Sequence, residues 1–240
     1  MEAEVEAVMQ ASPDALTIHP WDYKGADEEI LLLEHTFFST VPESFMRLPA
    51  YSHWVESQDH IHAYVQLKKM LQYLQWQNPG RENKRWVLKS PHHLGFIDKL
   101  LNVFPDSKVI QTHRDPYKTV PTYCSMCANI FEPISNSSDK EEIGHHWANK
   151  LAKVLNHCMK ISRLTKENFL DLEFNKMIKD PISEMTEVYD FIGEDFTHQA
   201  ENAMKAWKEE NQHEMGAHQY SLKEFNLDYS FISENFNEYI

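Results

Sequence analysis

Cationic and imidazole side chains follow two short apolar segments of this chain, and their chemistry suits the transfer of an anionic group. Lys89 and His93 come after the apolar run 85–89, and Arg114 comes after the apolar run 108–112. Ligands of open α/β sheets collect beyond the carboxyl ends of the strands, so neighbouring strands would bring these three side chains to one crevice. There the cations would hold a phosphate and the imidazole would move a proton. Taken singly, each residue is also compatible with a surface charge or a helix cap.

The elements around these residues alternate between strand and helix. Pro91 and Pro116 end the apolar runs, and each is followed by apolar residues at helical spacing. Strand, helix, strand, helix is typical of a parallel α/β sheet with right-handed crossovers. The pattern predicts helices over 30–38, 62–77, 93–104, 140–164 and 181–192, a helix that starts at 116, and strands over 85–89, 108–112 and 169–174.

Composition restricts the classes of protein to which the chain can belong. With 240 residues, 42% of them hydrophobic, the chain can form one sizeable domain. Its net charge of -14 argues against general binding of nucleic acids or anionic membranes. No apolar run is long enough for a membrane span, and residues 1–6 lack a basic start. Three cysteines do not make a disulfide framework, so we expect a reducing compartment and a cytoplasmic protein.

Charge is distributed unevenly along the chain. Residues 81–118 carry eight Lys and Arg against four acids, whereas residues 1–46 carry one base against ten acids. A basic segment in an acidic protein indicates either a local anion site or a solvated surface patch. Both candidate segments, with Lys89 and Arg114, lie inside it.

Five segments, in order, resemble a largely bacterial family of sulfotransferases. The segment 85–94, RWVLKSPHHL, is similar to that family's W-x-L-K-S-P-x-H-L, and 104–116, FPDSKVIQTHRDP, is similar to its F-P-D-A-x-V-x-x-x-H-R-D-P. Residues 120–122, VPT, stand where the family usually has V-P-S. The pair 180–181 with 188–193, DP and VYDFIG, and the segment 216–222, GAHQYSL, resemble its two closing motifs.

The resemblance implies a P-loop-type parallel sheet flanked by helices, and a reaction that uses 3′-phosphoadenosine 5′-phosphosulfate (PAPS) without a metal. Arg114 and Thr122 would hold the 3′-phosphate, and Lys89 would stabilise the leaving phosphate. His93, rather than His92, would be the general base for the hydroxyl or amine of a small-molecule or carbohydrate acceptor. Ser90 and Phe174 complete the implied donor-binding set, with Phe174 near the adenine where relatives often have a tyrosine.

The chain departs from the family in one respect. Six widely separated glycines form no Gly-rich phosphate loop, and the family's opening strand and loop have no counterpart here. We therefore expect residues 1–240 to be one domain that is incomplete at its N-terminus, with a helical part (1–80) and a nucleotide-binding part with C-terminal helices (81–240). We expect little transferase activity from this chain alone, and self-association through an unpaired sheet edge.

Three alternatives have weaker support. The chain could be an inactive sulfotransferase remnant or an interaction protein, with no catalytic step of its own. A nucleotide kinase relative would need a Walker-type loop with metal-linked acids, and neither is present. Cys124 and Cys127 have CxxC spacing, but a zinc or redox centre there lacks a second pair of cysteines. The histidine pairs His60/His62 and His145/His146 have no ligand spacing that supports a metal site.

Overall fold

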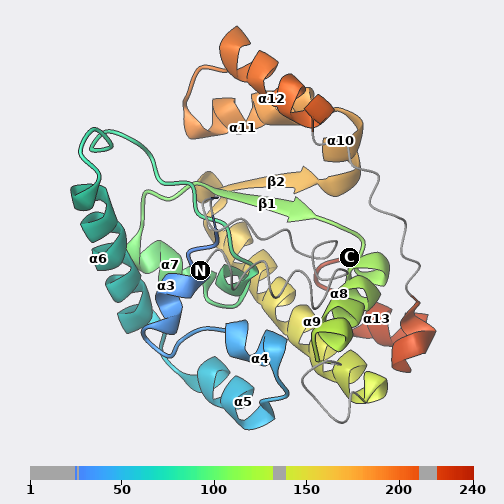
Figure 1. The fold of residues 1–240 in the computed structure, drawn as a ribbon. Coiled ribbons are helices and arrows are strands. Elements are labelled where there is room, and N and C mark those ends of the chain that lie inside the picture. Colours follow the sequence, from blue (N-terminus) through green and yellow to red (C-terminus); the bar gives the residue numbers. More distant parts are fainter. Residues whose placement is uncertain (1–24, 26, 132–138, 211–220) are drawn as a thin grey trace.

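The computed structural model describes residues 25, 27–131, 139–210 and 221–240, which form a helix-rich α/β domain (Figure 1). None of the described helices is long and apolar enough to cross a membrane. In chain order the elements are α3 (Ile30–Glu34), α4 (Val41–Phe45), α5 (Pro49–Ser57), α6 (Ile61–Gln77), η1 (Pro91–Gly95), α7 (Ile97–Val103), β1 (Val109–His113), α8 (Pro116–Phe131), α9 (Lys140–Leu164), η2 (Lys166–Asn168), β2 (Phe169–Glu173), α10 (Phe174–Lys179), α11 (Pro181–Ile192), α12 (His198–Glu210), η3 (Leu222–Phe225) and α13 (Tyr229–Asn235).

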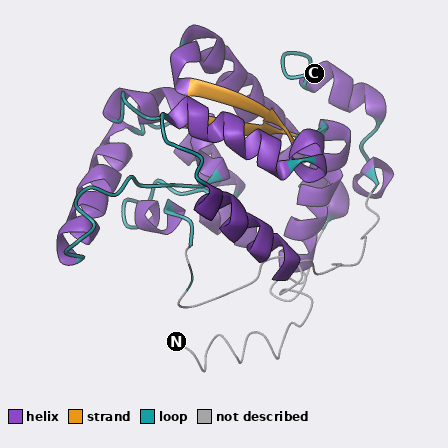
Figure 2. Cartoon of the chain, turned by 90° about the horizontal axis from the view of Figure 1, so that it is seen from above, coloured by secondary structure: helices purple, strands orange, loops and turns teal. Residues whose placement is uncertain are grey.

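The sheet of the described residues consists of the parallel pair β1 and β2, joined by a crossover through α8 and α9. Val109 pairs with Phe169 and His113 with Glu173, so both strands end at the same edge. Seen from above, the two strands lie side by side and helices occupy most of the remaining chain (Figure 2). This register brings the residues that follow the strands, Arg114 and Phe174, to one end of the sheet.

The prediction of a strand over 85–89 is wrong. That segment has no regular secondary structure, with Trp86 43% and Val87 89% exposed. A strand needs a hydrogen-bonded neighbour, and among the described residues none pairs with this segment or with the second edge of β1. Arg85 instead fixes the segment to the end of α11, where its Nη1 donates to the Ile192 carbonyl at 2.9 Å.

The other predicted elements are present, and several of them have changed ends. The strands over 108–112 and 169–174 are β1 and β2, and the 140–164 helix has the predicted bounds. The predicted 93–104 helix is divided into η1 and α7 at Phe96, and the first helix ends at Glu34, ahead of Phe37 with its φ of 62°. Of the predicted motif over 216–222, all but Ser221 and Leu222 lie outside the described residues.

Helix α9 separates two apolar clusters and contacts both. One cluster packs α8, α9, η3 and α13 around Trp147, Phe225 and Phe236. The other packs α3, α6, α7 and the start of β2 around Leu33, Tyr64, Leu67 and the α9 residue Cys158. Because α9 also lies beside β1 through the Cys158–Gln111 contact at 3.2 Å, it connects the sheet to both clusters.

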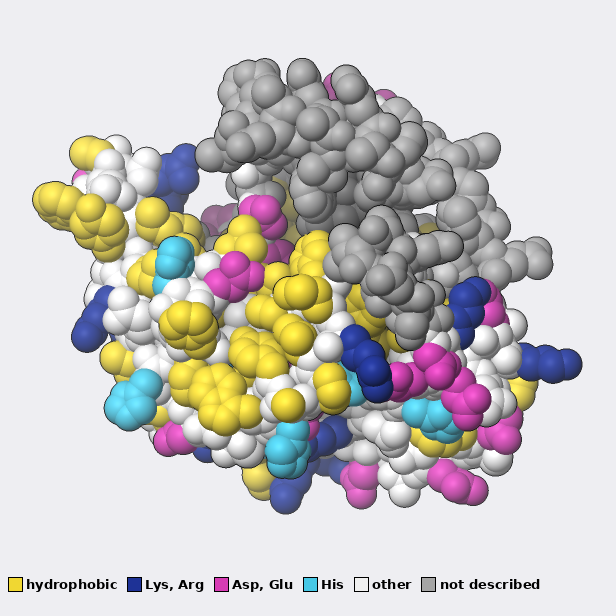
Figure 3. Space-filling model, turned by 60° about the horizontal axis from the view of Figure 1, so that its bottom comes forward, with side chains coloured by type: hydrophobic (Ala, Val, Ile, Leu, Met, Phe, Trp, Pro, Cys, Tyr) yellow, Lys and Arg dark blue, Asp and Glu magenta, His cyan; other side chains and the backbone are white. Residues whose placement is uncertain are grey.

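Some large apolar side chains remain outside these clusters. Phe37, Phe45, Met46 and Trp54 are each at least 41% exposed, and they belong to α4, α5 and the turn after α3. Figure 3 brings forward the face on which apolar side chains gather.

We predict that Gly144→Ala destabilises the fold. A Cβ at this position of α9 would lie 2.5 Å from the Phe225 carbonyl oxygen and 2.7 Å from the Phe225 Cβ, so η3 would have to move. Overpacking of this kind costs about 1–3 kcal/mol, more than the gain of roughly 1 kcal/mol that alanine brings within a helix. Urea unfolding measures the difference, with the exposed α9 substitution Asn149→Ala as the control. Gly144→Ala with wild-type or higher stability would contradict the packing of η3 on α9.

Candidate functional site

The turn between β1 and α8 presents Arg114 at the carboxyl end of the sheet. Asp115 begins α8, because its Oδ1 accepts a hydrogen bond from the Tyr117 backbone N–H at 2.9 Å and Pro116 occupies the first helical position. The Arg114 guanidinium carbon lies 4.6 Å from the centre of the Phe174 ring, a cation–π contact between the ends of the two strands. The register therefore joins two residues that are 60 positions apart in the sequence.

Arg114 differs from other arginines of the chain in its partners. Arg47, Arg85 and Arg163 each form an ion pair with a glutamate. Within the described part of the chain, no side chain or carbonyl accepts a hydrogen bond from the Arg114 guanidinium. An exposed guanidinium that lies against an aromatic ring and has no carboxylate partner can bind an anion.

Thr122 lies on α8, eight residues after Arg114, and is half-buried. Its hydroxyl donates to the Lys118 carbonyl at 2.7 Å, one turn back toward the start of the helix. The lone pairs of the hydroxyl oxygen are not used by this bond, and the hydroxyl can rotate to donate elsewhere. Arg114 and Thr122 thus lie on the same strand–turn–helix unit, as the sequence predicts.

Lys89 and His93 lie in a second group of residues, held by two acids from the start of α3. The Lys89 ammonium forms an ion pair with Glu28, and its backbone N–H donates to Glu29 Oε2 at 2.8 Å. Ser90 begins η1 by accepting a hydrogen bond from the His92 backbone N–H at 3.3 Å. No contact among the described residues joins this group to Arg114, because 85–89 does not form the neighbouring strand that would bring the two together.

Both ring nitrogens of His93 have partners. Nε2 contacts Glu29 Oε1, and Nδ1 lies 2.9 Å from the Tyr64 hydroxyl. The side chains of His93 and Glu29 are only 12% and 5% exposed. The sequence analysis missed Glu29 and Tyr64, because the acids at 27–29 also suit a helix N-terminus and Tyr64 belongs to an ordinary apolar stripe.

The protonation states of Glu29 and Tyr64 give this chain of hydrogen bonds a direction. Burial raises the pKa of Glu29. The interactions with His93 lower this pKa by more than burial raises it, so the net pKa is below its usual value. Burial and the nearby Glu29 charge raise the pKa of Tyr64 well above its usual value. Tyr64 therefore stays a phenol that donates to Nδ1, while Nε2–H donates to the Glu29 carboxylate.

His92 has a different environment from its neighbour His93. It is 4% exposed, its Nδ1 lies 3.3 Å from Thr40 Oγ1, and its ring packs on Phe96. Burial lowers the pKa of His92 well below its usual value. His92 is thus a neutral residue of the packing between η1 and the turn before α4.

The cysteines and histidines of the described residues do not form a metal site. Cys124 and Cys127 are buried, unpaired and part of the α8 apolar cluster. Burial raises the pKa of the Cys124 thiol to about 12, so it is not a thiolate at neutral pH. Across the described ranges, no group of three or more His, Cys, Asp or Glu side chains is arranged to hold a metal ion.

Comparisons with known proteins identify the family. The profile described as "Sulfotransferase family" matches residues 1–198, most of the chain. The chain belongs to the sulfotransferase family. Among solved structures it is similar to sulfotransferase STF9 from Mycobacterium avium (26% identity, TM-score 0.83, 97% of this chain and 62% of that one) and to sulfotransferase STF1 from Mycobacterium tuberculosis H37Rv (24%, 0.76, 96% and 62%). A comparison with curated proteins gives no significant match.

These similarities show the sulfotransferase fold, an α/β architecture with a parallel sheet. The chain spans 62% of the length of each of the two mycobacterial proteins.

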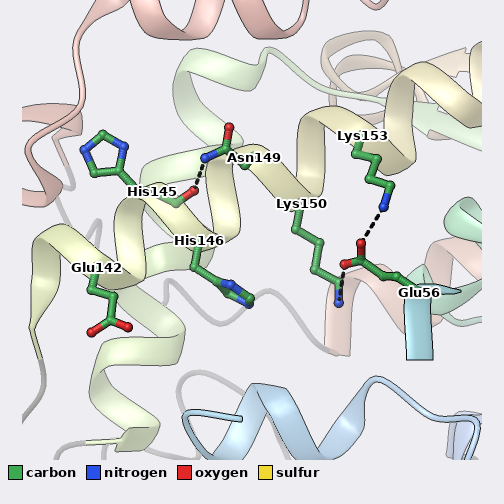
Figure 4. Close-up of a pocket in the computed structure, with 7 residues that line it drawn as sticks. All are labelled: Glu56, Glu142, His145, His146, Asn149, Lys150 and Lys153. Carbon is green, nitrogen blue, oxygen red and sulfur yellow. Dashed lines mark hydrogen bonds and ion pairs between the residues drawn. The ribbon is translucent and has the colours of Figure 1, made fainter. Parts of the chain in front are cut away.

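This member of the sulfotransferase family has a charged cavity of about 370 Å³ between α5 and the first half of α9 (Figure 4). The buried Lys150 ammonium contacts the carboxylates of Glu43 and Glu56 and lies 3.0 Å from Ser52 Oγ. Lys153 pairs with the other oxygen of Glu56 at 2.5 Å. Because these charges neutralise one another, the network fixes α4 and α5 on α9 and leaves little charge for a ligand.

We predict that Lys150→Met lowers the free energy of unfolding by about 3–5 kcal/mol, since it leaves the buried Glu43 carboxylate without its cation. The double variant Glu43→Gln/Lys150→Met should recover most of that loss. Lys153→Met, in which an ion pair with a 64% exposed lysine is broken, should cost less than about 1 kcal/mol. Urea unfolding at neutral pH measures all three. Equal losses for Lys150→Met and Lys153→Met would show that the Lys150 network does not hold α4 and α5.

Proposed function

We propose that this chain transfers a sulfuryl group from PAPS to a hydroxyl or amine of an acceptor. The observation that carries the proposal is Arg114, which has no carboxylate partner among the described residues and lies on the Phe174 ring at the carboxyl end of β1 and β2. Membership of the sulfotransferase family supports the reaction class. A free guanidinium and the family both support a donor that carries phosphate and sulfate groups.

Arg114 and Thr122 are suited to hold the 3′-phosphate of the donor. The guanidinium supplies planar N–H donors to phosphate oxygens, and the Thr122 hydroxyl supplies one more from α8. Phe174, already in contact with Arg114, offers its ring face to the adenine. When bound, PAPS supplies the activated sulfuryl group, and 3′-phosphoadenosine 5′-phosphate (PAP) is the product that remains.

His93 is suited to take the proton of the acceptor, with Glu29 as its positioning residue. Because Nε2–H points at the Glu29 carboxylate, Nδ1 is the basic nitrogen of the ring. In this arrangement an acceptor hydroxyl replaces the Tyr64 hydroxyl at Nδ1, and Glu29 stabilises the imidazolium that forms. Lys89, whose side chain is 78% exposed, leaves Glu28 when the donor binds and contacts the phosphate oxygens of the donor instead.

A specific observation also favours a second function, nucleotide binding without transfer. Lys89 and both nitrogens of His93 have protein partners, and the sequence contains no Gly-rich loop to hold the 5′-phosphosulfate. A chain with this function binds PAP through Arg114 and shows no turnover. Sulfate transfer distinguishes the two functions.

We predict that Arg114→Ala weakens PAP binding by about 1.5–3 kcal/mol, the usual size of a charge-assisted hydrogen bond. Isothermal titration of the 240-residue chain with PAP measures the affinity. Arg163→Ala is the matched control, because Arg163, in the last turn of α9, is also exposed but pairs with Glu238. Unchanged affinity in Arg114→Ala would remove Arg114 from the site.

We further predict that His93→Ala lowers turnover by about 10²–10⁴-fold, the contribution of a positioned base, in a form of the protein that also carries a loop for the 5′-phosphosulfate. Transfer of labelled sulfate from PAPS to a panel of alcohols, phenols and amines measures it. His92→Ala is the control and should stay within a few-fold of wild type per folded molecule, because His92 is buried among Thr40, His60 and Phe96. A larger loss of turnover in His92→Ala than in His93→Ala would assign the base to His92.

A further inference from the structure

His113, the last residue of β1, connects the parallel strands to the segment that follows α13. Its Nε2 lies 2.7 Å from Asp171 Oδ1 on β2, and its Nδ1 lies 3.2 Å from the hydroxyl of Tyr239. The rings of His113 and Tyr239 are also in contact, with their centres 5.4 Å apart. Both nitrogens of this imidazole therefore have partners, and the next residue of the chain is Arg114.

The protonation state of Tyr239 gives these hydrogen bonds a direction. Burial raises the pKa of Tyr239, and a hydrogen bond from the Arg114 backbone N–H offsets only part of that rise. Tyr239 therefore stays a phenol at neutral pH, and its hydroxyl can donate to His113 Nδ1 while its oxygen accepts from the Arg114 N–H. The ring proton of His113 is then on Nε2, where it faces the carboxylate of Asp171.

The segment 236–240 is anchored to the apolar cluster of α8, α9 and η3. Phe236 is fully buried in this cluster, and the Tyr239 backbone N–H donates to the Phe236 carbonyl at 2.9 Å. The ion pair between Arg163 and Glu238 is exposed on both sides, so it adds little to this anchoring. The buried Phe236 ring therefore places the Tyr239 hydroxyl at the end of β1.

These contacts restrict Arg114 through its backbone. Its guanidinium has no carboxylate partner among the described residues and lies on the Phe174 ring. A cation–π contact at an exposed site is weak and does not fix the turn between β1 and α8 by itself. The hydrogen bond to its N–H, and a preceding residue that is held through both ring nitrogens, fix the turn instead. A side chain that is held in place before the ligand arrives loses less conformational freedom when it binds.

We propose that Tyr239 is a positioning residue for the donor site, which holds the turn between β1 and α8 through the Arg114 N–H and the His113 ring, so that the guanidinium faces the 3′-phosphate. The inference rests on the proposed function, because it assigns Tyr239 a role in binding the donor. Tyr239 itself makes no contact with the nucleotide. Asp171 acts one step further away, by orienting the His113 ring.

Isothermal titration of the 240-residue chain with PAP and with adenosine 5′-monophosphate (AMP), which lacks the 3′-phosphate, tests this role. Tyr239→Phe keeps the ring and removes the hydroxyl. Its affinity for PAP should fall about three- to tenfold, the net contribution of one hydrogen bond, whereas its affinity for AMP should stay that of wild type. Tyr73→Phe, which removes the hydroxyl of an exposed tyrosine on α6, is the control and should bind both nucleotides as wild type does.

A purely structural role of Tyr239 would give a different result. Equal PAP affinity of wild type and Tyr239→Phe would overturn the proposal. An equal loss of affinity for PAP and AMP, or a large loss of stability in urea unfolding of Tyr239→Phe, would also overturn it, because the hydroxyl would then support the fold and not the 3′-phosphate site.

Nuclear magnetic resonance without nucleotide separates this inference from the proposed function. Selective ¹⁵N-arginine labelling gives the Arg114 amide signal, which Arg114→Lys identifies by removing it. Tyr239→Phe should speed hydrogen exchange of the Arg114 amide and leave that of Arg47 unchanged. An unchanged Arg114 amide would overturn the inference, whether or not PAP binds. A responding Arg114 amide in a wild-type chain that binds no PAP would overturn the proposed function, because Tyr239 would then hold an arginine that binds no donor.

Discussion

The parallel register of β1 and β2 determines which side chains of this member of the sulfotransferase family can act together. Pairing of His113 with Glu173 places Arg114 and Phe174 next to one another, although α8 and α9 separate them in the sequence. Asp115 and Pro116 then start α8 at once, so that Thr122 projects from the helix that begins at the same edge. The proposed donor site depends on this edge, because Arg114 and Phe174 directly follow the two strands.

Acidic side chains neutralise several of the lysine side chains of this protein. Glu28 pairs with Lys89, and Glu43 and Glu56 pair with Lys150, so that these positive charges are neutralised within the fold, while Glu29 holds the ring of His93. Among the described residues no carboxylate pairs with the Arg114 guanidinium, which lies on the Phe174 ring at the end of the sheet. A strongly acidic protein can therefore present a local anion site, because the local partners of a charge matter more than the net charge of -14.

Much of the fold could be predicted from the sequence, because periodicity and Pro or Gly punctuation mark most elements. The 140–164 helix and the end of α11 at Gly193, with its φ of 72°, are examples. The prediction of a strand over 85–89 was wrong. An apolar run shows that a segment can form a strand, but it does not show that a neighbouring strand is there to pair with it. Glu29 and Tyr64 could not be found from the sequence, since their roles depend on contacts with η1. The family motifs indicated Arg114 and Thr122, which the structure describes on one strand–turn–helix unit.

The most direct test of the account is a crystal structure of this chain with PAP bound. The account predicts that the 3′-phosphate lies between the Arg114 guanidinium and the Thr122 hydroxyl, with the adenine against the Phe174 ring and β1 and β2 in the register described here. A nucleotide bound elsewhere, with Arg114 still on Phe174 and free of phosphate, would contradict the claim that the carboxyl end of this parallel pair is the donor site.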